Sequence, residues 1–330
     1  MPAKESRKSM EREKRIKSGR LLEVDFYPVL ENGRRLPTRA PKTAPSLPEQ
    51  IRYNRTQAIK KLIRLVNANF DSTDNFLHPT YRTKDAPQTE EEAKRDVVNF
   101  LRRIKTRRAS ELKRQQQKLK SAKAAAAKLQ ENEFLAKEIK NIKTKIDKLS
   151  EEFKYIYVME KVTYKTGRYA GRSNWHFHMF ITGGLDPAVI ETIWERGATN
   201  CNRFQPEKFG PESAAVYMSK DPKGKKSFMY SRNLKKPDVL PPKDGKITAR
   251  GVEKLASQRV DDAEYWERRY KGYRFIRCYA RLNPFNGHWY VSVIMYKKTD
   301  KTAEWETEWK IEDWITTDFT ERVKNGRKNC

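Results

Sequence analysis

The chain has 330 residues, enough for one large or two modest domains, and its formal net charge is +28. This charge indicates a polyanionic partner, nucleic acid first and an anionic membrane surface second. No run of about eighteen apolar residues exists, so we expect no segment that spans a bilayer, and the basic N-terminus lacks the apolar core of a signal peptide. Three widely spaced cysteines form no metal or redox motif and favour a reducing cytoplasm.

The first 48 residues predict a basic N-terminal arm and a linker. Residues 1–20 are mostly Lys, Arg, Glu and Ser, which favours a solvated tail over a phosphate-binding arm. Residues 21–27 predict a short strand or a segment packed on the core, and residues 33–48 are a proline-rich linker. Apolar positions at helical spacing then predict a helix over residues 49–69.

Residues 75–81 predict a short strand that contains Pro79, and proline belongs at a sheet edge or a bulge. We expect His78 on this strand to contact solvent or DNA rather than to bind metal. A helix begins near Thr89, with acidic residues in its first turn. It ends in basic residues that could follow a phosphate backbone, Arg102, Arg103, Arg107 and Arg108 among them.

Residues 109–152 contain neither glycine nor proline and predict a helical, coiled-coil-like insertion. The apolar positions of its second half alternate steps of four and three: Leu135, Ile139, Ile142, Ile146, Leu149 and Phe153. The segment is either one long helix or a hairpin bent near Asn132. A hairpin could bury its own apolar stripe, and a homodimerisation arm or a DNA clamp are the functional alternatives.

The strongest motif is the buried strand of residues 175–181, which carries His176 and His178 two positions apart. Alternate residues of a strand share a face, so both imidazoles point the same way and could bind a divalent metal. The alternative is a pair of structural histidines that cap a core. On the preceding strand Glu160 lies among aliphatic residues and therefore needs a partner.

A second motif follows on a predicted helix that begins near Pro211, where Tyr217 and Lys220 share a face. A tyrosine and a lysine beside two histidines suggest a nucleophile, a charge stabiliser and a Lewis acid. Tyr230 is a weaker candidate nucleophile, because it has no lysine three residues later. Basic residues interleaved with aromatic ones suit single-stranded DNA: Arg172, Lys223, Lys225, Lys226, Arg232, Lys235 and Lys236.

Residues 241–330 form the third predicted region. A polar helix over residues 248–269 leads to a β-hairpin of residues 273–282 and 289–296, because Asn286-Gly287 between apolar runs is a strong hairpin signal. The acidic tail that follows carries three tryptophans and could pack on the core or recruit a helicase or polymerase.

The His-x-His strand followed by a helical Tyr-x-x-Lys resembles the rolling-circle replication initiators of the HUH endonuclease class, of the phage and plasmid type found in Gram-positive bacteria. Residues 231–237 also resemble the corresponding segment of these proteins. Residues 75–81 occupy the place of the family's first motif, from which His78 and Pro79 depart. The resemblance implies an α+β fold in which a central antiparallel sheet with flanking helices carries the histidines on its middle strands. This nicking domain would span residues 49–240, interrupted by residues 109–152.

The resemblance also implies a mechanism. Mn²⁺ or Mg²⁺ on His176, His178 and Glu160 would polarise a phosphodiester of single-stranded origin DNA, and a salt bridge is the alternative role for Glu160. Tyr217, assisted by Lys220, would attack phosphorus and leave a 5′-phosphotyrosyl link and a 3′-OH primer. No Walker-type motif is present, so we expect a host helicase and a host polymerase in the bacterial cytoplasm as partners.

Three other functions stay open at this point. A relaxase or a transposase would use the same chemistry on another substrate. A non-catalytic, basic nucleic-acid-binding protein would need the histidines only for its structure. A coiled-coil scaffold with a basic surface is the third.

Overall fold

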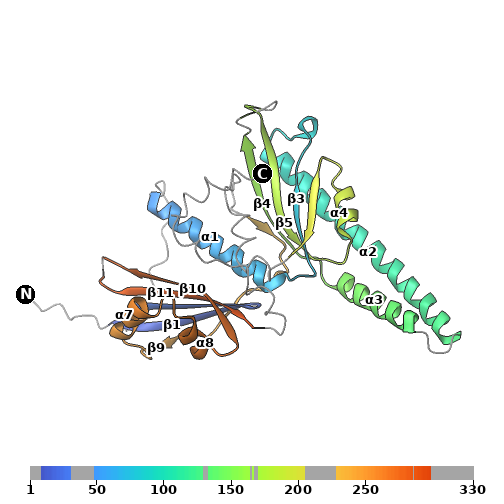
Figure 1. Ribbon diagram of the computed structural model, residues 1–330. Coiled ribbons are helices and arrows are strands. Elements are labelled where there is room, and N and C mark those ends of the chain that lie inside the picture. Colours follow the sequence, from blue (N-terminus) through green and yellow to red (C-terminus); the bar gives the residue numbers. More distant parts are fainter. Residues whose placement is uncertain are drawn as a thin grey trace, which may run out of the picture. The chain divides into compact units, whose positions relative to one another are not determined.

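The computed structural model contains two antiparallel sheets and, among the residues that it describes, six helices, so the chain is an α+β protein (Figure 1). The chain divides into two compact units, one of residues 1–68 and 235–330 and the other of residues 69–234. Within the described ranges no helix is long and apolar enough to cross a membrane. The described residues are 9–30, 48–128, 133–163, 166, 170–204, 228–284 and 286–298.

The first unit is built on a sheet with the strand order β10–β11–β2–β1–β8, and β9 also pairs with β1. Two short helices, α7 and α8, cover one face, where Trp266 and Val252 pack with Phe26 and Val293. The elements are β1 Ser9–Ser18, β2 Leu21–Leu30, α1 Pro48–Asn69, β8 Asp238–Val239, β9 Lys243–Asp244, α7 Ala249–Gln258, α8 Ala263–Arg269, β10 Tyr273–Leu282 and β11 Trp289–Lys297.

The prediction of a solvated tail over residues 1–20 is wrong for its second half, because β1 is a full strand between β2 and β8. Six of its ten residues are charged, yet Glu11 and Glu13 are buried. Glu13 pairs with Arg269 at 3.0 Å and Glu11 with His288 at 2.8 Å. Polar pairs with distant side chains therefore take the place of the apolar alternation by which a strand is normally predicted.

Gly19 makes the turn between β1 and β2 with φ of +56°, and a Cβ there would lie 2.0 Å from the backbone oxygen of Asn67. We expect Gly19→Ala to lower the free energy of unfolding by about 2–3 kcal/mol, from a strained φ and a clash with backbone. Gly245→Ala is the matched control, because Gly245 has a similar φ of +66° and open space around it. If urea unfolding shows equal losses of unfolding free energy for Gly19→Ala and Gly245→Ala, then the contact between the new Cβ and Asn67 costs nothing and the prediction is wrong.

The predicted C-terminal hairpin is confirmed as β10 and β11, with Gly287 at φ of +67° in its turn. The predicted helix over residues 248–269 is two helices, α7 and α8, each capped by its own N-terminal side chain, Thr248 and Asp262. The hairpin pairs with β2, so the N-terminal strands, α1 and the C-terminal region form one unit. The structure thus divides the chain at other places than residues 48 and 240.

The second unit is built on a five-stranded sheet with the order β6–β3–β5–β4–β7, in which β5 is the middle strand. Helices α2 and α4 cover one face, where Phe100, Ile104 and Trp194 pack with Phe177 and Met179 (Figure 1). The elements are β3 Asn75–Pro79, α2 Glu90–Lys128, α3 Glu133–Ser150, β4 Tyr155–Thr163, β5 Ser173–Ile181, α4 Pro187–Ile193, β6 Thr199–Arg203 and β7 Met229–Tyr230.

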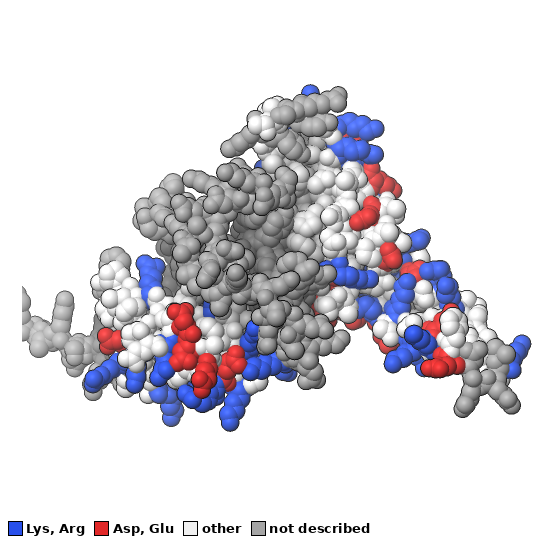
Figure 2. Space-filling model, in the orientation of Figure 1, with Lys and Arg blue, Asp and Glu red and all other residues white. Residues whose placement is uncertain are grey.

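The helical insertion is the hairpin that the sequence left as one of two alternatives. Helix α2 runs 39 residues to Lys128, and α3 packs back along it (Figure 1). Ile142 and Leu149 of the predicted apolar stripe are buried, and Lys145 of α3 pairs with Glu111 of α2 at 3.3 Å. Figure 2 shows Lys and Arg side chains spread over this hairpin with acidic ones between them.

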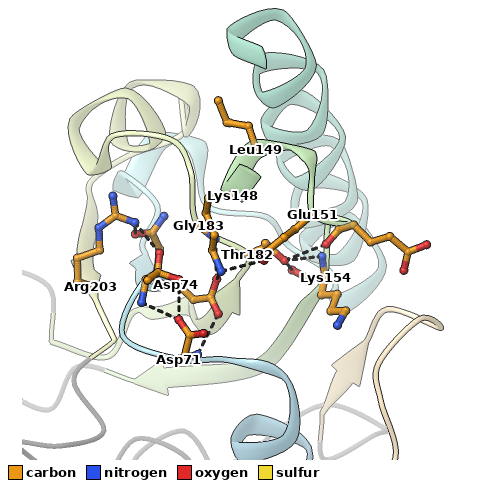
Figure 3. Close-up of polar contacts among 12 residues, drawn as sticks. Asp71, Asp74, Lys148, Leu149, Glu151, Lys154, Thr182, Gly183 and Arg203 are labelled. Atoms are coloured by element: carbon orange, nitrogen blue, oxygen red, sulfur yellow. Dashed lines mark hydrogen bonds and ion pairs between the residues drawn. The ribbon is translucent and has the colours of Figure 1, made fainter. Parts of the chain in front are cut away.

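A buried polar network joins the base of this hairpin to the end of β5 (Figure 3). Asp74 accepts a hydrogen bond from the backbone N–H of Gly183 at 2.8 Å and pairs with Lys148 at 2.9 Å. Arg108 donates to the carbonyl oxygens of Thr182 at 3.0 Å and Glu151 at 3.1 Å, and also to those of Lys148 and Leu149. These bonds fix where β5, the central strand, leaves the sheet.

Candidate functional site

The site lies on the face of the second unit's sheet opposite α2 and α4. In β5 the residues Trp175, Phe177, Met179 and Ile181 point into the helix-covered core, as predicted. His176 and His178 alternate with them and therefore point to the other face. Glu160 of β4 lies directly opposite His176 in the antiparallel register, and Val158 lies opposite His178.

The side chains on this face form a short chain of contacts. His178 Nε2 lies 3.2 Å from Glu160 Oε2, and His178 Nδ1 lies 2.8 Å from His78 Nδ1. The His78 ring in turn packs edge-on against Phe76, at 4.4 Å between centroids, and Phe76 stacks on Phe180 at 4.6 Å. The Nε2 atom of His176 is buried and has no hydrogen-bond partner among the residues that the structure describes.

His78 departs from its sequence-based expectation, which placed it at solvent or DNA. It reaches His178 because β3 lies next to β5, and position 78 is two residues from Phe76 on the same face. The ladder between β3 and β5 stops at Leu77 and resumes as one bridge at Thr80, which leaves Pro79 at an interruption. The two-residue spacing of Phe76 and His78 indicates in the sequence that they share a face. It does not indicate that this face meets His178, because that depends on which strand lies next to β3.

Burial lowers the pKa of His78 to about 4, and the neighbouring His178 and His176 act in the same direction. Burial also lowers the pKa of His176, opposed by Glu160. The neutral imidazole of His78 is thus favoured in the folded chain, which suits a group that accepts or donates a single hydrogen bond to another histidine.

We expect the metal-free chain to lose stability as the pH falls from 6.5 to 4, because unfolded His78 has the higher pKa and binds a proton first. Stability from this group is complete above pH 6.5, and its loss by pH 4 amounts to about 2–3 kcal/mol. Urea unfolding at several pH values, in chelator, measures the effect as the difference between the parent and His78→Asn. Parallel pH profiles for the two chains would contradict it.

The donor set of the site, two imidazoles and a carboxylate, is one that binds Mn²⁺ or another divalent ion. Neighbouring ligands on an octahedral ion lie about 3 Å apart, close to the 3.2 Å between His178 Nε2 and Glu160 Oε2. Nevertheless, no group of three or more His, Cys, Asp or Glu side chains in the described part of the chain is arranged so that it could hold a metal ion. Of the three proposed ligands, His178 and Glu160 are therefore in direct contact.

The predicted DNA-contacting cations have different surroundings. Arg102, Arg107, Arg172 and Arg232 are exposed, as are Lys235 and Lys236 at the start of the other unit's C-terminal part. Arg103 pairs with Glu195 at 2.8 Å. The prediction for Arg108 is wrong, since its side chain is 4% exposed and donates to four backbone carbonyl oxygens.

Several predicted residues lie outside the described residues. They are the candidate nucleophile Tyr217, its neighbour Lys220, and Lys223, Lys225 and Lys226. The alternative nucleophile Tyr230 is described: it is 41% exposed on β7, opposite Ile156 of β4. Because Ile156, Val158 and Glu160 alternate along β4, Tyr230 belongs to the same sheet face as the histidines.

No protein-family model matches the chain, and neither does any curated protein or solved structure. The residues and geometry of the site are therefore the only basis for a functional conclusion.

Proposed function

We propose that this chain is a replication-initiator endonuclease that nicks single-stranded origin DNA by tyrosine attack. The observation that carries the proposal is the arrangement of the central strands. Glu160, His176 and His178 share the sheet face opposite α2 and α4, and His178 contacts Glu160 at 3.2 Å. The resemblance to HUH replication initiators implies metal-binding side chains at this position of the sheet.

Each residue has a proposed role. His176, His178 and Glu160 would hold Mn²⁺ or Mg²⁺, which supplies a Lewis acid for the scissile phosphate when bound. The Tyr217 oxygen would form a bond to phosphorus while the bond from phosphorus to the 3′-oxygen of the preceding nucleotide breaks. The tyrosine proton passes to that oxygen, giving a 5′-phosphotyrosyl link and a 3′-OH. Lys220 would stabilise the tyrosinate or the charge on the phosphate.

The surroundings of the site support single-stranded rather than duplex DNA as substrate. For attack on phosphorus between two nucleotides, the DNA backbone must lie against a sheet face lined by aromatic and imidazole rings. Unpaired bases can stack on such rings. Arg172 and Arg232, which come from the loops that flank β5 and β7, are exposed and able to contact phosphates. The 3′-OH product would prime rolling-circle replication with a host helicase and polymerase.

The test is cleavage of end-labelled, single-stranded candidate origin DNA with Mn²⁺, followed by a denaturing gel. We expect a covalent protein–DNA adduct with the parent chain, and none with Tyr217→Phe or in chelator. The matched control is Tyr230→Phe, which should form the adduct at the parent level.

Each other result has a definite meaning. An adduct that survives Tyr217→Phe and disappears with Tyr230→Phe would move the nucleophile to β7. Adduct formation on the DNA of a conjugative or transposable element, but not on a replication origin, would identify a relaxase or a transposase. DNA binding without any adduct, unaffected by chelator, would leave a non-catalytic nucleic-acid-binding protein.

A further inference from the structure

A second surface with nucleic-acid chemistry lies in the first unit, on the face of its sheet opposite α7 and α8. There the sheet and helix α1 line an open cavity of about 360 Å³. Three tyrosines from three strands line it, Tyr27 of β2, Tyr279 of β10 and Tyr290 of β11. Tyr279 is 54% exposed and Tyr290 is 37% exposed, so their rings are open to a ligand.

The register of the strands places the tyrosines next to cations. Arg281 of β10 lies opposite Tyr290, and Arg12 of β1 lies opposite Tyr27. The guanidinium of Arg277 lies over the Tyr279 ring, 5.0 Å from its centroid. The outer face of the sheet therefore presents aromatic rings and positive charge in alternation rather than an apolar patch.

The cavity lining carries an excess of positive charge. Lys14, Lys60 and Arg281 line it, and none of them forms an ion pair with a carboxylate in the described part of the chain, although Asp25 lies opposite Lys14 in the strand register. The acidic groups nearby are already engaged, because Asp25 accepts a hydrogen bond from Ser292 and Glu23 pairs with Arg64. An anionic ligand in the cavity would consequently contact cations. The second carboxylate oxygen of Asp25 would be the one acidic group near it that is not already engaged in the described part of the chain.

We infer that this cavity and its rim bind single-stranded DNA, with bases on Tyr279 and Tyr290 and phosphates on Lys14, Lys60 and Arg281. Stacking of bases on aromatic side chains beside cations is how sheets bind single strands. A duplex keeps its base faces inside its own stack and cannot offer them to the tyrosines. The site does not rest on the proposed nicking activity, since it lies in the other unit and needs neither metal nor Tyr217.

The test is fluorescence anisotropy of labelled oligothymidine of about 12 nucleotides, bound to full-length chain carrying Tyr217→Phe in chelator, so that no cleavage is possible. We expect Tyr279→Ala with Tyr290→Ala to weaken binding about tenfold or more, because each stacked base contributes. The same positions changed to Phe should keep the parent affinity. Tyr53→Ala is the matched control, a tyrosine of α1 that is 59% exposed and does not line the cavity.

Two further measurements locate the contact. Arg281→Ala should make the salt dependence of binding less steep by about 0.7 in log–log slope, the contribution of one phosphate on a single strand. Lys254→Ala, an exposed cation on α7, should leave that slope unchanged. A 5-bromouracil oligonucleotide should photocrosslink to Tyr279 or Tyr290, as mapped by mass spectrometry.

Parent-level affinity in the double alanine variant would overturn the inference, and so would crosslinks confined to residues 69–234. Equal competition by duplex DNA would overturn the preference for single strands. Tighter binding of oligouridine than of oligothymidine would replace DNA by RNA as the ligand. Because nicking is abolished in every chain used here, none of these results depends on whether the proposed endonuclease activity exists.

Discussion

Arg108→Leu is expected to lower the free energy of unfolding by about 3–5 kcal/mol. The guanidinium is 4% exposed, and its nitrogen atoms donate to the carbonyl oxygens of Thr182, Lys148, Leu149 and Glu151 at 3.0–3.3 Å. Leucine fills much of the same volume but removes the donors of four carbonyl oxygens, and the bonds to Thr182 and Leu149 are buried while those to Lys148 and Glu151 are half-buried. Each unsatisfied buried polar group costs about 1–3 kcal/mol. Urea unfolding of the two chains gives the difference directly.

Arg107→Leu is the matched control, because Arg107 precedes Arg108 on the same helix but is exposed. Its unfolding free energy should change by less than about 0.5 kcal/mol, whereas its affinity for DNA falls if α2 contacts phosphates. An Arg108→Leu chain as stable as the parent, but with weakened DNA binding, would restore the phosphate contact that the sequence predicted. The pair of variants thus separates a structural arginine from a binding one.

Positions 107 and 108 are both arginine, yet one is exposed and the other buried, which local sequence patterns do not predict. Both belong to one basic cluster, and helical periodicity alone assigns neither to the surface, because the position of α3 and of the end of β5 decides which one is buried. The same limit applies to β1, whose buried glutamates pair with Arg269 and His288, more than 250 residues away in the chain. Local patterns carry no information about such distant partners.

Patterns that depend on one strand or one helix were reliable. The two-residue period placed His176 and His178 on one face and their aromatic neighbours in the core, and the Asn-Gly turn signalled the β10–β11 hairpin. Glu160 faces His176 because β4 and β5 pair in a simple antiparallel register. His78 could not be placed in this way, since β3 reaches β5 from a hundred residues earlier. The sequence therefore predicted that Glu160, His176 and His178 lie on one face, and the structure adds His78 to them.

His178→Ala should lower the affinity for Mn²⁺ by at least about 100-fold and abolish adduct formation, because His178 joins the other side chains of the site. Its Nε2 meets Glu160 and its Nδ1 meets His78. Loss of a residue that only orients a metal ligand costs about 10- to 100-fold, so loss of the ligand itself should cost more. His78→Ala should then fall within that smaller range, because His78 contacts the second nitrogen of His178.

Manganese binding is best measured by electron paramagnetic resonance of the free ion, in chains that carry Tyr217→Phe, so that affinity is separated from chemistry. His288→Ala is the matched control: His288 also pairs with a buried glutamate, Glu11 at 2.8 Å, but belongs to the other unit. Its affinity for Mn²⁺ should equal that of the parent. If His178→Ala and His288→Ala bind Mn²⁺ equally well, then the His178–Glu160 contact is a structural pair like the one at Glu11, and the proposed metal chemistry has no site on this sheet.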